Sequence, residues 1–210
     1  GLQIQTHLEF APHWGWGSSS TLISNIARWL NIDPYQLLKN TFRGSGYDIA
    51  CATAQSPLFY SLDSMQPQTE PIAFNPPFAD NLWVIYLNQK QSSSEAIKNH
   101  IRKNKIKNQL LQRITEISEQ MAQETSDNKF IQLMTEHESL IGDFTAQKPV
   151  KERYFNDFPG GIKSLGAWGG DFFLALSQIT EDETKKYFQT KGLDILFKLK
   201  DIKLDTNYAT

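Results

Sequence analysis

The chain has 210 residues and a mass of 24.0 kDa, enough for one large domain or two small ones with a proper hydrophobic core. Its net charge of -2 and pI of about 6.1 do not favour nucleic-acid binding. No apolar run approaches the roughly 20 residues of a membrane helix, and no secretion signal is visible. The single cysteine excludes an internal disulfide framework. We therefore expect a cytoplasmic protein with no nucleic-acid or membrane partner.

Apolar patterning predicts the elements of the first third of the chain. Alternation from Leu2 to Phe10 predicts a strand, and helical spacing predicts a helix over Thr21–Leu30. Asp33 as N-cap and Pro34 at the first helical position predict a second, short helix. The stretch "RGSGYDIACATA" predicts a turn and a helix of small residues that places Cys51 in the core. Proline-broken extended pieces follow.

The remaining elements alternate between strands and helices. Leu82–Leu87 is a continuous apolar run and predicts a buried strand. Asp127 is the expected cap of a helix that reaches about Ile141. The stretch "DFPGGIKSLGAWGGDFF" predicts a turn before the strand "FFLAL", and "TEDETKKYFQTKGL" predicts a helix with Gly192 as C-cap. The alternating "DILFKLKDIKL" predicts a last strand. The long helix before Asp127 is expected to show one apolar face, marked by Ile97, Ile101, Leu110, Ile114, Ile117 and Met121.

Interspersed helices and strands, some of them neighbours, predict an α+β fold with two layers. The Pro76-Pro77 and Asp80-Asn81 pairs indicate a boundary, so we expect two domains, residues 1–80 and 81–210.

Three glycine-rich turns are the candidate functional features. The first, "GWGSSST", precedes a helix; glycines let the backbone approach a phosphate, and helix N-terminal amides attract anions. Serine hydroxyls can also bind a phosphate or place an oxygen on Mg²⁺. The alternative is an N-cap serine after a flexible turn. The spacing is not that of a Walker A loop.

The second and third turns repeat this design. In "GSGYD", Asp48 is either a helix cap or a functional carboxylate, that is, a general base or a group that orients a metal. The functional role requires that it face the first turn. In "KSLGAWGGDFF", Lys163 and the backbone amides of Gly166 to Gly170 are either parts of an anion site or a hairpin-like connection.

The three motifs together resemble those of the GHMP kinases. "GWGSSST" is similar to the family's central G-x-G-S-S motif, "GSGYD" to the turn that presents the catalytic aspartate of mevalonate and phosphomevalonate kinases, and "KSLGAWGGDFFLAL" to its third motif. The pentapeptide "GYDIA" at Gly46–Ala50 is that of a bacterial subgroup. Trp16 stands where the family usually has Leu, and Trp168 and Asp171 replace glycines. The first family motif is absent, so the chain resembles a member without its N-terminal third.

This resemblance implies a ribosomal protein S5 domain 2-like ATP-binding part in residues 1–80 and a ferredoxin-like domain in residues 81–210. It implies a kinase that uses ATP and Mg²⁺ and phosphorylates a mevalonate-like, phosphomevalonate-like or sugar acceptor, with Asp48 as the catalytic residue and Ser18 as the metal contact. A homodimer is left open. Implied substrate contacts are Ser45, Gly46, Ser93 and Lys163, and implied ATP contacts are Gly15, Trp16, Gly17, Ser18, Ser19, Ser20, Gly166, Ala167, Gly169 and Gly170.

Two alternative functions are compatible with the same family resemblance. A nucleotide-binding relative without catalysis is favoured by the altered third motif. An ATP-dependent decarboxylase similar to diphosphomevalonate decarboxylase is the other, although the aspartate of "GSGYD", followed by an aliphatic residue, is more similar to the kinases.

Overall fold

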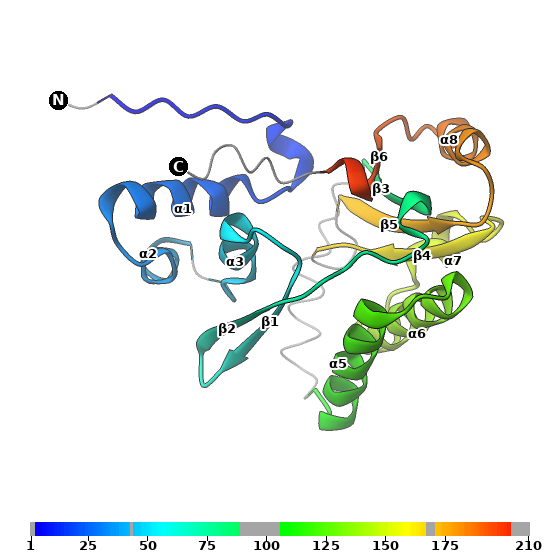
Figure 1. Ribbon diagram of the computed structural model, residues 1–210, viewed down its shortest axis with the longest axis horizontal. Helices are drawn as coiled ribbons and strands as arrows, with labels where there is room; N and C mark the ends of the chain where they lie inside the picture. The colour runs from blue at the N-terminus through cyan, green and yellow to red at the C-terminus, as the bar shows by residue number, and fades with distance from the viewer. Residues whose placement is uncertain (1–2, 43, 89–105, 167–170, 203–210) are drawn as a thin grey trace. The chain divides into compact units, whose positions relative to one another are not determined.

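The computed structural model describes residues 3–42, 44–88, 106–166 and 171–202 (Figure 1). The described residues form two compact units, the first up to Phe74 and the second from Asn75 to Ile202. Helices and strands are mixed in both units, which confirms the predicted α+β class. None of the described helices is long and apolar enough to cross a membrane.

The first unit consists of three helices and a hairpin. Helix α1 spans Ser18–Leu30, α2 spans Pro34–Thr41 and α3 spans Tyr47–Thr53. A short 3-10 turn, η1, precedes them at Pro12–Trp14. Helix α1 packs against both α2 and α3 because its small and apolar residues recur at helical spacing on one face. The buried residues of that face are Ser20, Ile23, Ser24 and Ala27.

The predicted start of α2 is confirmed, whereas the predicted strand at Leu2–Phe10 is wrong. The Asp33 carboxylate accepts a hydrogen bond from the backbone amide of Tyr35 at 2.8 Å, and Pro34 is the first helical residue. Residues 3–10 form no strand, and Ile4 is 60% exposed. Alternation specifies which side of a strand is apolar, but a strand also needs a hydrogen-bonding partner, and no described strand pairs with this segment.

The hairpin joins strands β1 (Leu58–Asp63) and β2 (Gln66–Pro71) in antiparallel register. Its two-residue turn, Ser64 and Met65, has positive φ at both positions, as in a type I′ turn. The sequence "QPQTEP" has no apolar alternation, so patterning did not predict β2 as a strand.

The second unit has a four-stranded antiparallel sheet in the order β4-β5-β3-β6. With the helices between them, the strands follow the β-α-β-β-α-β order of a ferredoxin-like fold. Helix α6 packs against α5 and against the edge strand β4. The elements are β3 (Leu82–Tyr86), α5 (Asn108–Gln123), α6 (Asp127–Thr145), α7 (Val150–Tyr154), β4 (Gly160–Ser164), β5 (Phe172–Ser177), α8 (Glu181–Thr190) and β6 (Leu196–Lys198), preceded by the 3-10 turn η2 (Ala79–Asn81) and followed by η3 (Leu199–Asp201).

The core of this unit lies between one face of the sheet and helices α7 and α8. Every residue of β3 is buried, which confirms the predicted strand. Phe173 of β5 stacks with Phe155 at 5.1 Å and with Phe188 of α8 at 5.7 Å between ring centroids. Other core members are Trp83, Ile85, Leu87, Val150, Phe158, Ile162, Ala175 and Leu193.

Several helices begin or end at residues other than the predicted ones. Helix α1 begins at Ser18 rather than Thr21, and the cap of α6 is Ser126 rather than Asp127, because the Ser126 side chain accepts from the Lys129 amide. The C-cap of α8 is Lys191, and Gly192 follows it in a Schellman turn whose Leu193 amide bonds the Phe188 carbonyl.

Three further differences concern whole elements. Helix α7 and strand β4 were not predicted, and β6 is shorter than the alternation suggested. On the apolar face predicted for the long helix, Leu110, Ile114, Ile117 and Met121 are at least half-buried in α5. Ile97 and Ile101 lie outside the described residues.

A substitution at Gly160, the first residue of β4, tests how closely the sheet packs. A Cβ atom on Gly160 would lie 2.1 Å from the Leu176 carbonyl oxygen, and Gly160 has φ 151°. We expect Gly160→Ala to lower the free energy of unfolding by about 3 kcal/mol or more, measured by urea denaturation. The control is Gly161→Ala, whose Cβ would meet only side-chain atoms at 3.1 Å or beyond. Equal costs for the two variants would contradict the backbone clash.

Candidate active site

The first glycine turn forms a cluster of aromatic rings before α1. The 3-10 turn Pro12–Trp14 ends at Gly15, which has φ 69°. Trp16 contacts Trp14 at 5.1 Å and Phe10 at 5.8 Å between ring centroids. The rings therefore pack on one another and fix the path by which the chain enters the helix.

Helix α1 begins without a side-chain cap. Its N-cap is Gly17, and no side chain bonds the first amides of the helix. The alternative of an N-cap serine is therefore wrong, because the serines lie inside the first turn. Neither Ser18 nor Ser19 has a hydrogen bond from its hydroxyl to another described residue, and Ser20 is buried.

This end of α1 suits an anion chemically. An uncapped N-terminus leaves amide donors without intrahelical partners, and the helix dipole adds positive potential. No acidic residue lies in the first turn, and a Cβ on Gly17 would meet nothing within 4 Å, so space is open beside the turn. Amides and hydroxyls that share one open space can together hold a phosphate.

Tyrosine side chains hold the second glycine turn tightly. The hydroxyl of Tyr60 in β1 donates to the Ser45 carbonyl, and the Tyr60 ring contacts that of Tyr47 edge-on at 5.8 Å. Gly46 is buried with φ 85°, and a Cβ there would lie 2.9 Å from the Tyr35 ring. Only glycine fits both this backbone conformation and this contact.

Asp48 lies in the first turn of α3, two residues after Gly46, and it is exposed. The N-cap of α3 is Gly46 without a side-chain cap bond, so Asp48 does not act as the N-cap. Because α1 packs against α3, the helix of the first turn and the helix of the second belong to one compact unit.

Cys51, one turn further along α3, was expected in the core but is exposed. Partial burial raises the pKa of its thiol, although a hydrogen bond with Tyr47 lowers it. Burial, with that same hydrogen bond, raises the pKa of Tyr47 to about 12. The small-residue pattern predicted the helix correctly but could not determine which side of it faces the interior. A thiol with a raised pKa is a weak nucleophile at neutral pH.

Lys163 of the third motif belongs to a cluster of charged and polar groups in the second unit. Its ammonium lies 3.7 Å from Oε1 of Glu138 and 3.2 Å from Nδ1 of His137, both on α6. The Ser164 hydroxyl donates to Oε2 of Glu138 at 2.8 Å. Glu138 is 2% exposed, and its Oε1 has no hydrogen-bond partner, so the nearby ammonium is what compensates its charge.

The surroundings in this cluster also shift the pKa values of His137 and Lys163. Burial lowers the pKa of His137 to about 4, and the Lys163 charge adds to the effect. Burial lowers the pKa of Lys163 as well, while Glu138 opposes that change. A neutral His137 can accept a hydrogen bond from the Lys163 ammonium at Nδ1 when its proton is on Nε2.

The predicted site residues are therefore distributed over both units. Gly15 to Ser20, Ser45, Gly46 and Asp48 lie in the first, and Lys163 and Gly166 in the second. Gly166 has φ 69° in the turn that follows β4. Ser93 and the residues 167–170, which include Ala167, Gly169 and Gly170, lie outside the described residues.

Sequence reasoning missed Tyr60, His137 and Glu138. Tyr60 is one of several aromatic residues in an extended stretch, and only the fold places it against Ser45. His137 and Glu138 lie in a helix rich in polar residues, where a glutamate is usually solvated. A helical-wheel analysis would have found the signal, since Glu138 follows buried Phe130 and Met134 at spacings of eight and four.

The shifted pKa of His137 makes stability depend on pH. Between pH 6.5, its ordinary pKa, and about 4, the unfolded chain binds a proton at His137 that the folded chain does not. The free energy of unfolding should therefore fall as pH falls through this window, by about 1 to 2 kcal/mol after allowance for solvent access. His137→Gln should flatten this slope, as measured by urea unfolding at several pH values.

The matched control is His7→Gln, which removes an exposed histidine of the first unit. It should keep the slope of the unaltered protein. A His137→Gln variant whose stability still falls as steeply would contradict the neutral, buried imidazole.

Comparison with solved structures relates this geometry to known proteins. The phosphomevalonate kinase of Streptococcus pneumoniae, solved with phosphomevalonate and AMPPNP, matches with a TM-score of 0.65 and 18% identity over 89% of this chain and 69% of its own. The mevalonate kinase of L. major, solved with R-mevalonate, matches with a TM-score of 0.59 and 16% identity over 86% of this chain.

This chain spans 64% of the length of that mevalonate kinase, slightly less than two thirds. No protein-family model matches the sequence, and no curated protein matches it. At these identities the likeness establishes the fold, which is that of the mevalonate and phosphomevalonate kinase structures.

Proposed function

We propose that this chain is part of an ATP-dependent GHMP-type kinase that transfers the γ-phosphoryl group to a hydroxyl or phosphate of a small metabolite. The observation that carries the proposal is the uncapped, serine-bearing first turn of α1 after Gly15 and Gly17. The fold supports it, because one neighbour binds phosphomevalonate and AMPPNP and another binds R-mevalonate. We assign the chain to the subgroup with the "GYDIA" pentapeptide and favour a mevalonate- or phosphomevalonate-like acceptor over a sugar.

The phosphate site in this proposal is the turn Gly15 to Ser20. The amides at the start of α1 bind the phosphates of ATP, and the hydroxyls of Ser18 and Ser19 donate to phosphate oxygens. Trp16 covers one side of the turn with its ring. Phosphoryl transfer needs mainly positioning and charge neutralisation, and both come from backbone donors that are already oriented. Residues 1–80 would then form the ATP-binding domain and residues 81–210 the second domain.

A magnesium ion fits this site only with oxygens from the nucleotide. The part of the chain that the structure describes has no group of three or more His, Cys, Asp or Glu side chains that could hold a metal. Magnesium commonly keeps few protein ligands and binds substrate phosphates, so the Ser18 hydroxyl is the protein ligand that we propose. Bound Mg²⁺ would neutralise charge on the phosphates.

Asp48 is the catalytic residue in this proposal. Its carboxylate is exposed at the start of α3, so an acceptor can reach it. The carboxylate accepts the proton of the attacking hydroxyl, work that contributes about 10²- to 10⁴-fold in rate. Because Gly46 is clamped by Tyr35 and Tyr60, the turn that carries the carboxylate has little freedom to move.

The remaining contacts follow the motif assignment. Ser45, Gly46 and Ser93 are assigned to the acceptor, and Gly166, Ala167, Gly169 and Gly170 are assigned to the ATP phosphates. We also assign Lys163 to the acceptor. Its ammonium contacts Glu138 and His137, so it would add a partly compensated charge.

Substitution of Asp48 separates binding from chemistry. We expect Asp48→Asn to lower kcat by about 10²-fold or more and to leave the Kd for ATP within about twofold, since the amide is isosteric but cannot take a proton. ADP release is measured with mevalonate-type, sugar and amino-acid acceptors while CO₂ is scored. The protein assayed is the longest natural form that carries this chain.

Three other outcomes would each contradict part of this proposal. Unchanged turnover in Asp48→Asn would remove Asp48 from catalysis. ATP binding with no turnover by the unaltered protein on any acceptor would favour the non-catalytic relative. Release of CO₂ with ADP would favour the decarboxylase.

The serines of the first turn test the phosphate site independently. We expect Ser18→Ala and Ser19→Ala each to weaken ATP binding by about tenfold, the value of one hydrogen bond to a charged group. Titration calorimetry with a non-hydrolysable ATP analogue measures the Kd. The control is Ser24→Ala, because the Ser24 hydroxyl bonds the Ser20 carbonyl within α1. Equal affinities of all three variants would contradict the assignment of the turn.

A further inference from the structure

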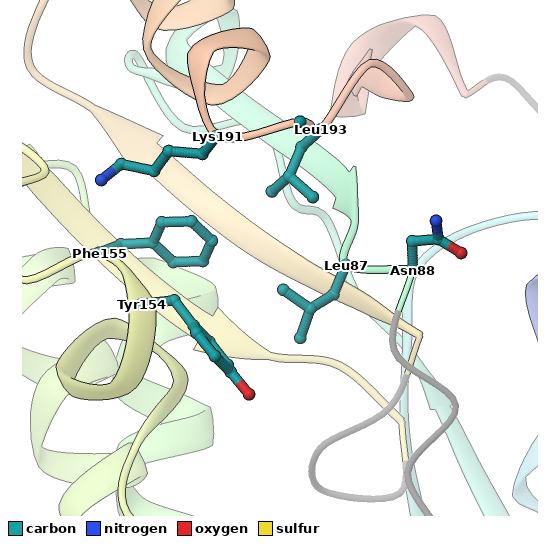
Figure 2. Close-up of a pocket in the computed structure, with 7 residues that line it drawn as sticks. Leu87, Asn88, Tyr154, Phe155, Lys191 and Leu193 are labelled. Carbon is teal, nitrogen blue, oxygen red and sulfur yellow. The ribbon is translucent and has the colours of Figure 1, made fainter.

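A pocket of about 390 Å³ lies in the second unit, at the end of β3 (Figure 2). It is lined by the two residues after β3, by the last residue of α7 with the residue that follows it, and by the turn after α8. None of the site residues named above lines it. Its described lining residues are Leu87, Asn88, Tyr154, Phe155, Lys191 and Leu193, together with Gly192.

The base of this pocket is apolar and fixed. Figure 2 shows the side chains of Leu87, Phe155 and Leu193 directed toward a common space. All three belong to the buried core cluster, so they are held by packing against the sheet and α8. The Schellman turn fixes Leu193, whose amide bonds the Phe188 carbonyl. A rigid apolar base with a few polar groups at its rim is the usual design of a small-molecule site.

The stem of one lysine, Lys191, lies at the rim, and its ammonium is directed away from Leu87 and Leu193 (Figure 2). Lys191 is the only charged residue among the described lining residues. Its ammonium lies 3.3 Å from Oδ1 of Asp157 and 4.8 Å from the centroid of the Tyr187 ring. The Asp157 side chain is 70% exposed, so this ion pair is a surface pair that contributes little to stability. Because this pair is weak and the lysine stem is flexible, rotation of the Lys191 side chain can bring its ammonium over the pocket, where a ligand carboxylate replaces Asp157 as its partner.

Two neutral groups complete the rim. The hydroxyl of Tyr154 accepts a hydrogen bond from the Arg153 guanidinium, whose carbon lies 4.8 Å from the Tyr154 ring centroid. The side-chain amide of Asn88 is exposed at the opposite wall, and it has no hydrogen-bond partner among the described residues. These groups can satisfy the polar end of a ligand whose apolar part covers Leu87 and Leu193.

We propose that this pocket is a binding site for a small carboxylate with an apolar body, held by Lys191 at the carboxylate and by Leu87, Phe155 and Leu193 at the body. The volume suits a compact ring or short aliphatic chain and is too small for a helix of a partner protein. The proposal does not depend on kinase activity.

The test uses 4-phenylbutyrate as the probe and 4-phenylbutanamide as its neutral counterpart. Each is titrated into the ¹³C-methyl-labelled chain, and the methyl signals of Leu87 and Leu193 are followed by NMR. We expect saturable shifts of both residues with the carboxylate, and binding about fivefold weaker with the amide, the upper value for one exposed ion pair. Lys191→Gln should reduce carboxylate affinity by the same factor and remove the preference over the amide.

The matched control is Lys185→Gln, which removes an exposed lysine of α8 that pairs with Glu181 and does not line the pocket. It should bind both probes as the unaltered chain does. Absence of shifts at Leu87 and Leu193, equal affinities for the two probes, or an unchanged preference in Lys191→Gln would each overturn the proposal.

Discussion

Helix α1 starts without a side-chain cap, and this constraint governs the chemistry available to the first unit. A helix normally satisfies some of its first amides with the oxygen of an N-cap residue. Here the cap is Gly17, which has no side chain, and three serines follow inside the helix. The donors are therefore left to water or to an acceptor from outside the chain. The aromatic contacts of Trp16 hold the turn without occupying those donors.

In the second unit, a charged side chain is buried beside the sheet and needs compensation. Strand β3 pairs with β5 on one side and β6 on the other, and its side chains supply much of the core. Beside the edge strand β4, Glu138 of α6 is buried. Lys163 and Ser164, adjacent on β4, compensate its two oxygens in different ways, one by charge and one by a hydrogen bond.

Local patterns predicted much of the fold. Three elements were predicted correctly because the conformational preferences of a short stretch agree with the structure. They are strand β3, helix α2 with Asp33 as its cap, and the helix that carries Asp48. The failures share a cause. Residues 3–10 alternate like a strand but have no described partner, and β2 has a partner but no apolar alternation. Pairing is a property of two segments, so one segment alone cannot reveal it.

For the candidate site, the glycine turns and Asp48 were visible because motifs lie in contiguous sequence. The tyrosine clamp on Gly46 and the ion pair of Glu138 join residues 11 to 25 positions apart, and only the fold brings them together.

The hydrogen bond from Tyr60 to the Ser45 carbonyl has a mechanical consequence. Tyr60 belongs to the hairpin, whose tip at Ser64 and Met65 is exposed to solvent. This hydrogen bond couples the position of the hairpin to the turn that precedes α3. The carbonyl that accepts it, that of Ser45, lies three residues before Asp48. The same bond restrains the backbone before Asp48 for as long as the hairpin keeps its register.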